Sequence, residues 1–215
     1  SIVVSHGVRW NRTPSSESLY NRIHEASAKF AMKYAHALVA NDSDFFRSLG
    51  VPIKPKEKMF QEVLPRRWFI PNCVDTNYFK KVEPIGNLIQ LRPVLVPRNI
   101  VRGRGVHLAI EAFCYFNKVF PKTNLVVCGD FSDEQYKKEL FSLVDALGLT
   151  GKVYFLGSMR CELMPRIYSS SLMSVIPTIY EEGTSLAAVE SMACGTATVS
   201  TNVGGLADLP TVQSA

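Results

Sequence analysis

Short apolar runs alternate with segments of helical periodicity in the first third of this chain. Residues 1–8, SIVVSHGV, have the β-branched composition of a buried strand, and a helical pattern follows at about 19–37. A second apolar run at 37–42 leads through good helix-capping residues into a brief helix. Residues 51–66 predict an irregular basic loop, and residues 67–72, RWFIPN, predict a further strand.

The alternation becomes strict after residues 82–86, VEPIG, which resemble a hinge. Predicted strands lie at 91–98, 124–130, 152–157, 171–178 and 197–202, and predicted helices at 105–119, 133–147, 161–169 and 184–194. Strands joined by such helices need parallel crossovers, and their apolar composition fits a sheet covered on both faces. We therefore expect an α/β protein with a doubly wound parallel sheet, divided into domains at 1–82 and 83–215.

Composition excludes several classes of protein. The 215 residues are 47% hydrophobic and 20% charged, which is typical of a globular chain and not of a disordered one. The net charge is +5, and its whole excess lies in residues 1–86, which hold 13 basic and 8 acidic side chains against 11 of each afterwards. This imbalance is too mild to indicate a nucleic-acid binder, although it leaves open a peripheral contact at the inner face of a membrane.

Cysteine usage and apolar run length bear on the compartment. The five cysteines are odd in number and form no CxxC pair, so a disulfide framework and a zinc site are not expected. No apolar run reaches the roughly 18–20 residues of a membrane span. We expect a cytoplasmic protein. The start at Ser1, without an initiator Met or a basic leader, indicates a processed chain or a fragment.

Ligands of doubly wound sheets bind at the carboxyl ends of the strands, so the loops after residues 97, 129, 157 and 178 are the places to examine. No GxGxxG follows a strand and no GxxxxGK[ST] occurs, which disfavours dinucleotide dehydrogenases and P-loop enzymes. A phosphate group would have to be held by other means.

The segment 180–205, YEEGTSLAAVESMACGTATVSTNVGG, combines two acids with a predicted helix start. Glu182 and Glu190 are eight apart, and Gly183 with Thr184 or Ser185 would present backbone N–H groups at the helix N-terminus. An anion site flanked by carboxylates suits a sugar nucleotide, because carboxylates accept hydrogen bonds from ribose or hexose hydroxyls. The alternative is that Glu182 only caps the helix and Glu190 is an ordinary solvated side chain.

Three arginines lie beside a strand-to-helix junction. Arg98 leaves a predicted strand, and Arg102 and Arg104 belong to a glycine-containing turn before the next helix. A guanidinium offers a fixed fork for phosphate oxygens and stays charged, so these side chains could neutralise a diphosphate. The alternative is a set of ordinary surface arginines in a loop.

Together these segments resemble the retaining glycosyltransferases of family four, which have the GT-B fold of two Rossmann-like domains. The matching stretches are HG after the first strand, ANDSDFFRSLG, PNCVDTNYF, the R-N-x-x-x-x-R-G turn, NLVVCGD, KVYFLG and EGTSLAAVESMACGTATVSTNVGG. The last stretch resembles the specific E-x7-E motif of that family with its GG continuation. The resemblance covers most of the chain.

The resemblance assigns roles residue by residue. Glu190 would accept hydrogen bonds from the nucleotide ribose, and Glu182 would face the transferred sugar. His6 would point toward the donor sugar from the acceptor domain, although a lone histidine after a strand is also a common structural residue. The remaining donor contacts would come from backbone and side chains of Gly183, Thr184, Ser185, Leu186, Met159, Arg98 and Arg104.

This sequence departs from the family pattern at three places. The turn has Arg104 where many members have Lys, and one extra residue leaves Arg102 as a second candidate for the phosphate clamp. Thr184-Ser185 replaces the usual Phe-Gly after the first Glu, which changes the sugar pocket. Cys73 replaces the Gly of the family's PNG turn.

The resemblance implies a hexosyltransferase that moves a sugar from a nucleotide-diphosphate sugar to a glycan, lipid-linked or small-molecule acceptor with retention at the anomeric carbon. No metal and no cofactor are expected, because no His/carboxylate cluster is present and the positive groups would replace a cation. A nucleotide-sugar-binding module without turnover and an epimerase of the same fold are the alternatives. The chain would be a fragment of both domains, each incomplete and with apolar faces that favour self-association.

Overall fold

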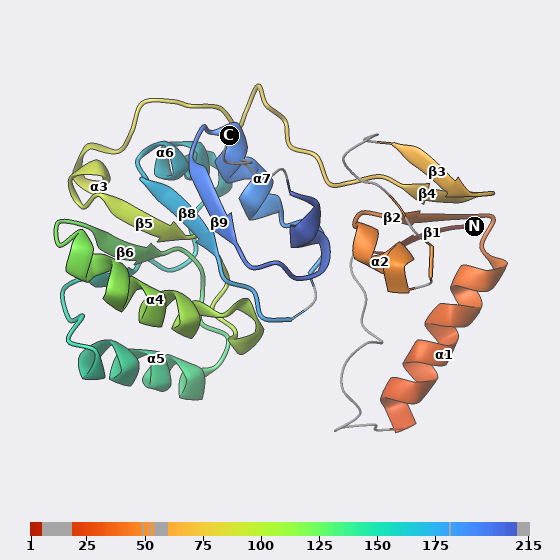
Figure 1. Ribbon diagram of the computed structural model, residues 1–215, viewed down its shortest axis with the longest axis horizontal. Helices are drawn as coiled ribbons and strands as arrows, with labels where there is room; N and C mark the ends of the chain where they lie inside the picture. Colours follow the sequence, from red (N-terminus) through yellow and green to blue (C-terminus); the bar gives the residue numbers. More distant parts are fainter. Residues whose placement is uncertain (6–18, 49, 52, 54–59, 181, 210–215) are drawn as a thin grey trace. The chain divides into compact units, whose positions relative to one another are not determined.

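The protein contains two sheets whose strands alternate with helices along most of the chain (Figure 1). The computed structural model describes residues 1–5, 19–48, 50, 51, 53, 60–180 and 182–209. Chain contacts divide it into two units. Unit 1 consists of Ser1–Asn72, Glu181–Ser185 and Asn202–Ala215, and unit 2 of Cys73–Tyr180 and Leu186–Thr201. The predicted division at 82/83 into acceptor and donor domains stays a prediction.

Unit 1 contains a four-stranded sheet in the order β1-β2-β4-β3. Its elements are β1 (Ile2–Ser5), α1 (Leu19–Tyr34), β2 (Ala37–Ala40), α2 (Ser43–Ser48), β3 (Gln61–Leu64), β4 (Arg67–Phe69) and the short helix η4 (Gly204–Asp208). Its core consists of Leu38, Ala40 and Phe69 from the sheet and Phe45 and Phe46 from α2. The sequence prediction missed β3, which pairs antiparallel with β4, because its four residues alternate between half-buried and exposed and no long apolar run marks an edge strand.

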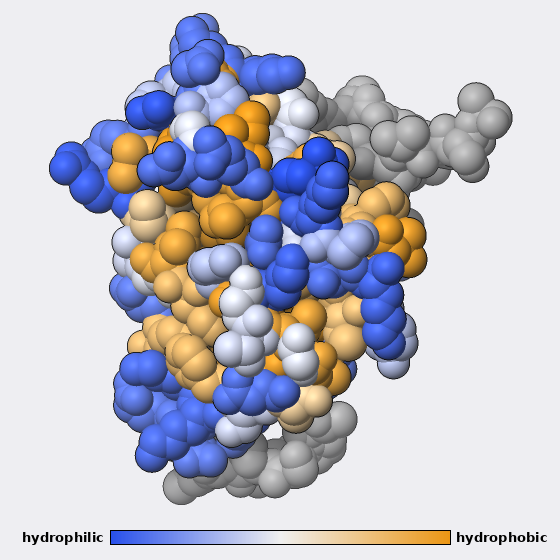
Figure 2. Space-filling model, turned by 90° about the vertical axis from the view of Figure 1, so that its left-hand side faces the viewer, coloured by the Kyte–Doolittle hydropathy of each residue, from blue (hydrophilic) through white to orange (hydrophobic). Residues whose placement is uncertain are grey.

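The opposite face of the unit 1 sheet carries exposed apolar side chains. Ile2 and Val4 of β1 are 71% and 50% exposed, and Trp68 of β4 is 38% exposed. The register Val4↔Val39 and Val39↔Trp68 places these residues on one face. Figure 2 shows that apolar residues reach the molecular surface elsewhere too, where they are interspersed with polar ones. The predicted self-association stays a prediction.

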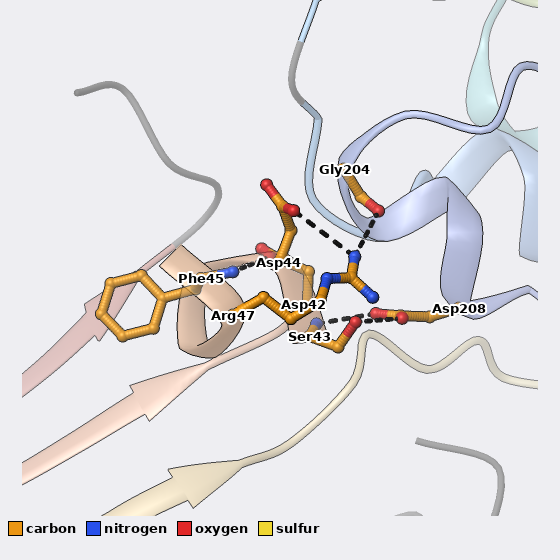
Figure 3. A network of polar contacts seen from close by, with 7 residues as sticks. All are labelled: Asp42, Ser43, Asp44, Phe45, Arg47, Gly204 and Asp208. Atoms are coloured by element: carbon orange, nitrogen blue, oxygen red, sulfur yellow. Dashed lines mark hydrogen bonds and ion pairs between the residues drawn. The ribbon is translucent and has the colours of Figure 1, made fainter. Parts of the chain in front are cut away.

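A network of polar contacts ties η4 to the N-terminus of α2 inside unit 1 (Figure 3). The backbone N–H of Ser43 donates to Oδ2 of Asp208 at 2.7 Å, and the Ser43 hydroxyl donates to Oδ1 of the same carboxylate. Arg47 donates to the carbonyl of Gly204 at 3.4 Å and pairs with Asp44 at 3.4 Å. Asp208 therefore occupies the position of an anion at a helix N-terminus, although it lies 165 residues further along the chain.

Asp42 lies beneath this network and is fully buried. Its Oδ1 accepts from the backbone N–H of Phe45 at 2.8 Å, so Asp42 caps the N-terminus of α2. Burial raises the pKa of Asp42 from 3.8 to about 6, with smaller upward contributions from Asp208 and Asp44, and the Phe45 hydrogen bond and Arg47 oppose the rise. At neutral pH the folded protein thus holds a poorly solvated carboxylate next to a second one.

Unit 2 contains a five-stranded parallel sheet in the order β7-β6-β5-β8-β9. The strands are β5 (Pro93–Val96), β6 (Asn124–Val127), β7 (Val153–Phe155), β8 (Met173–Ile176) and β9 (Ala197–Ser200); the helices are α3 (Gly86–Gln90), η2 (Arg102–Arg104), α4 (Val106–Val119), α5 (Glu134–Ala146), η3 (Cys161–Leu163), α6 (Met164–Ser169) and α7 (Leu186–Ala193). The chain order reverses at β5, which pairs with β6 on one side and with β8 on the other. The predicted doubly wound sheet is confirmed, and the exits of β5 and β8 form its topological switch point.

Both faces of the central strands of unit 2 are buried. Val94 and Val96 of β5 pack in one apolar cluster with α4 and α5, whereas Leu95 packs in a second cluster with α6. All four residues of β5 and of β6 are buried, which is why these segments are apolar in the sequence apart from Asn124.

Gly105 connects η2 to α4 and lies against the exit of β8. Its φ is +69°, and an added Cβ would lie 1.9 Å from the carbonyl oxygen of Pro177. We predict that Gly105→Ala lowers the free energy of unfolding by about 2–4 kcal/mol, because a left-handed backbone and a steric overlap both oppose the methyl group. Gly148→Ala is the matched control, since φ is +67° there and nothing lies within 4 Å. Urea denaturation followed by circular dichroism should show the larger loss at Gly105; equal losses would contradict this packing.

Asp42 predicts a specific pH dependence of unit 1 stability. Because its pKa is higher in the folded protein (about 6) than in the unfolded chain (3.8), its contribution to stability is complete below pH 3.8 and is lost as the pH rises through about 6. Asparagine is also a good N-cap but does not ionise. The free energy of unfolding of Asp42→Asn, relative to that of wild type, should therefore increase by about 2–3 kcal/mol as the pH rises from 4 to 7.5. Urea unfolding monitored by Trp10 and Trp68, both in the first 72 residues, measures this. A wild-type-to-variant difference that is the same at both pH values would refute the shift.

Candidate functional site

Arg98 lies at the switch point of the unit 2 sheet. It follows β5, is 8% exposed, and donates from Nη2 to the hydroxyl of Thr178 at 3.0 Å. Thr178 follows β8, so this hydrogen bond joins the two strand exits at which the chain order reverses. The alternative of a surface arginine is wrong for Arg98. A guanidinium buried at the carboxyl edge of a parallel sheet is suited to binding an anionic ligand.

Arg102 and Arg104 belong to η2, directly before α4. Arg102 forms an ion pair with Glu139 of α5, with 2.6 Å between Nη2 and Oε1. This hydrogen bond is the main cause that raises the pKa of Arg102 above its usual value and lowers that of Glu139. Arg104 is half-buried. The three arginines thus have different surroundings, although the sequence makes them look equivalent.

Glu190 belongs to α7 and is half-buried. Its Oε2 accepts a hydrogen bond from the hydroxyl of Tyr168 at 2.9 Å. Tyr168 is fully buried on α6, and burial, with Glu190 as the next cause, raises the pKa of its phenol, so the hydroxyl remains protonated as a donor. Glu190 is therefore a held carboxylate and not the freely solvated side chain of the alternative reading. The sequence carries no signal for Tyr168, because its separation of 22 residues from Glu190 is not a helical spacing.

The other unit 2 candidates lie at neighbouring positions of the fold. Met159 follows β7 and packs half-buried against the α6 side of the sheet. The loop before it is held by Asp130, whose Oδ1 accepts from the backbone N–H of Ser158 at 2.8 Å. Leu186 is the first residue of α7 and is 52% exposed.

The candidates that precede Leu186 belong to unit 1. Thr184 is buried, and its hydroxyl donates to the carbonyl of Asn41 at 2.7 Å, while its own carbonyl accepts from the Asn72 amide at 2.7 Å. Gly183 lies so close to Asn41 that an added Cβ would be 3.0 Å from Oδ1. The Thr184 side chain is thus used to anchor the loop, which sequence reasoning did not foresee.

Glu182 is half-buried, and its carbonyl accepts from the backbone N–H of Gly205 at 2.6 Å. Gly205 leaves no room for a side chain, since an added Cβ would lie 2.6 Å from the backbone of Gly183 and Thr184. The GG pair therefore supports the glutamate loop by direct backbone packing. Ser185 is buried beside it.

Some predictions fall outside these observations. His6 lies outside the described residues, so its assignment stays a prediction. Among the described residues, no three or more His, Cys, Asp and Glu side chains are grouped as metal ligands, and the predicted metal independence remains to be tested. No helix in the described part of the chain is long and apolar enough to cross a membrane.

Curated relatives of this chain are glycosyltransferases. The mannosylfructose-phosphate synthase of Agrobacterium fabrum is 32% identical over 147 residues, which are 63% of this chain and 32% of that protein. The lipopolysaccharide 1,2-N-acetylglucosaminetransferase of Salmonella typhimurium is 24% identical over 97% of this chain and 56% of its own length. The chain thus spans about a third to just over half of these relatives.

Solved structures share the fold. HepE of Anabaena, crystallised with UDP and glucose, has a TM-score of 0.72 and 21% identity over 96% of this chain and 54% of its own. The C-terminal domain of a glycosyl transferase group 1 family protein, LpcC of Francisella tularensis, has a TM-score of 0.56 and 27% identity over 62% of this chain and 72% of its own. The family model described as "Glycosyl transferases group 1" matches residues 91–211, more than half of the chain, and the protein belongs to that family.

Proposed function

We propose that this chain forms the nucleotide-sugar donor site of a retaining glycosyltransferase. The observation that carries the proposal is the environment of Glu190, the second acid of the E-x7-E segment, whose carboxylate is held by the buried hydroxyl of Tyr168 at 2.9 Å. A carboxylate kept in one orientation on a helix is suited to accepting hydrogen bonds from a ribose. The buried Arg98 at the switch point supports the same reading.

Glu190 would bind the ribose through the oxygen that Tyr168 does not use. Tyr168 donates to Oε2, so we assign Oε1 to a ribose hydroxyl. Such a charge-assisted hydrogen bond is among the stronger polar contacts. The orientation of the Glu190 carboxylate that accepts it is fixed, because the buried phenol of Tyr168 cannot rotate away from Oε2. Met159, after β7, would lie against the base, as the family resemblance implies.

The diphosphate would be bound by arginines and backbone N–H groups. Arg98 and an arginine of η2 would neutralise the charge that grows on the leaving diphosphate, and the N–H groups of Gly183, Thr184, Ser185 and Leu186 would add hydrogen bonds at the start of α7. These fixed groups cost no reorganisation during the reaction. They would supply the electrostatic stabilisation for which other transferases use a metal ion.

Glu182 would face the transferred sugar, together with His6. No covalent nucleophile is part of this proposal: the diphosphate departs, the acceptor hydroxyl attacks the same face of the anomeric carbon, and its proton passes to the phosphate. The bond to the diphosphate oxygen breaks and the bond to the acceptor oxygen forms with retention. The acceptor would be a glycan, a lipid-linked molecule or a small molecule.

A calorimetric titration of the chain with UDP, GDP and ADP, without metal and then with magnesium, tests the donor site. UDP is the first probe because HepE, of similar fold, was solved with it. We expect one nucleotide to bind without metal. Silence from all three, with circular dichroism showing a folded protein, would refute the proposal for this chain. In the full-length enzyme, release of free nucleotide from a nucleotide sugar would exclude an epimerase, and absence of turnover despite binding would indicate a binding module.

Substitutions divide the roles of the two acids. Glu190→Ala should weaken binding of the nucleotide by roughly 1–3 kcal/mol, because the ribose hydroxyls lose their acceptor. Tyr168→Phe should weaken it by about 1 kcal/mol, since it only releases the orientation of Glu190. Glu182→Ala should leave nucleoside diphosphate binding unchanged and impair sugar transfer by the full-length enzyme. Unchanged affinity in Glu190→Ala would overturn the ribose assignment.

A further inference from the structure

The arginine turn, residues 102–105, is held by the exit of β8. The backbone N–H of Ile179 donates to the carbonyl of Gly103 at 3.0 Å, and Gly105 packs against the carbonyl of Pro177 without room for a side chain. Within the turn, the N–H groups of Arg104 and Gly105 donate to the carbonyls of Val101 and Arg102 at 2.9 and 3.0 Å. These hydrogen bonds therefore fix the backbone conformation of the turn and the orientation of its N–H groups.

On another side the same turn is joined to α5 through the side chain of Arg102. Its Nη2 lies 2.6 Å from Oε1 of Glu139, and its guanidinium carbon lies 4.9 Å from the centre of the Tyr136 ring. Glu139 also accepts from the Gln135 amide at 3.3 Å, which orients the carboxylate. The guanidinium therefore makes an ion pair and a cation–π contact at once.

Tyr136 carries this connection on to α4. It is 1% exposed, its hydroxyl lies 2.7 Å from Nδ1 of His107, and the backbone N–H of His107 donates to it at 3.3 Å. Because a fully packed ring cannot shift without disturbing the core, Tyr136 is a rigid support. Arg102, Tyr136 and His107 thus link the turn, α5 and the start of α4.

We propose that Arg102 is a positioning residue that holds the arginine turn and does not bind the diphosphate itself. The inference rests on the proposed donor site, which left Arg102 and Arg104 as rival phosphate ligands. To reach a phosphate, Arg102 would have to give up its pairing with Glu139 and its stacking on Tyr136. The side chains of Arg102 and Glu139 are 54% and 42% exposed, so their ion pair adds little to the free energy of unfolding. Its main effect is to orient the Arg102 guanidinium.

Glu139→Gln separates the two roles of Arg102. If Arg102 positions the turn through Glu139, both Arg102→Ala and Glu139→Gln weaken binding of the nucleoside diphosphate that titrates wild type, by about tenfold, and the double variant is no weaker than Arg102→Ala alone. Binding of the corresponding nucleoside is unchanged. Arg102→Lys, which keeps the ion pair, recovers part of the affinity.

Lys137→Ala is the matched control on the same helix. The Nζ of Lys137 lies 3.4 Å from Oε1 of Glu134 and 5.5 Å from the centre of the Phe131 ring. The Lys137→Ala variant therefore also loses an ion pair and a cation–π contact. Its affinity should equal that of wild type. If Glu139→Gln leaves binding unchanged or strengthens it while Arg102→Ala weakens it, Arg102 is a phosphate ligand and the proposal is overturned.

Hydrogen exchange tests the positioning without any nucleotide. The amides of Arg104, Gly105 and Ile179 should exchange about tenfold faster in Arg102→Ala and Glu139→Gln than in wild type and Lys137→Ala, with unchanged thermal unfolding. Unchanged exchange would overturn the positioning role. If UDP, GDP and ADP all fail to bind wild type, the donor-site proposal fails, and the exchange result still decides whether Arg102 holds the turn.

Discussion

Burial of the central strands of unit 2 on both faces is the constraint on which the rest of that unit depends. Because β5 and β6 are covered by an apolar cluster on each side, their backbone polar groups must pair within a parallel sheet and their connections must cross over by helices. The strand order then reverses at β5, and the loops after β5 and β8 meet at the carboxyl edge. Arg98 and Thr178 are brought together by this topology alone.

Glycines allow the loops at this edge to pack backbone against backbone. Gly105 contacts the carbonyl of Pro177, and an added Cβ on Gly129 would lie 2.1 Å from the carbonyl of Arg98. In unit 1, Gly205 packs in the same way against the Gly183–Thr184 peptide. Loops held so closely have little freedom, and rigid loops are what a site needs if its donors are to be in place before a ligand arrives.

The acidic segment is divided between the two units along the chain. Its first part, 182–185, is held by unit 1 through Asn41, Asn72 and Gly205, whereas α7 with Glu190 belongs to unit 2. Asp208 strengthens the unit 1 part by binding Ser43 at the start of α2. Burial raises the pKa of the neighbouring Asp42 to about 6, and the Asp208 carboxylate adds a smaller upward contribution.

The sequence by itself determined the alternation of strands and helices, the parallel sheet of unit 2, and the positions of Arg98 and Gly105 at the ends of a strand and a helix. These features depend on apolar periodicity and glycine positions, which neighbouring residues along the chain define. It also carried the resemblance to glycosyltransferases, of which the family match confirms membership of glycosyl transferases group 1. Only the tertiary structure decided that Tyr168 holds Glu190, that Arg102 pairs with Glu139, and that Asp208 reaches Ser43 across 165 residues. Contacts between residues so far apart depend on how the elements pack in space, and no spacing along the chain encodes them.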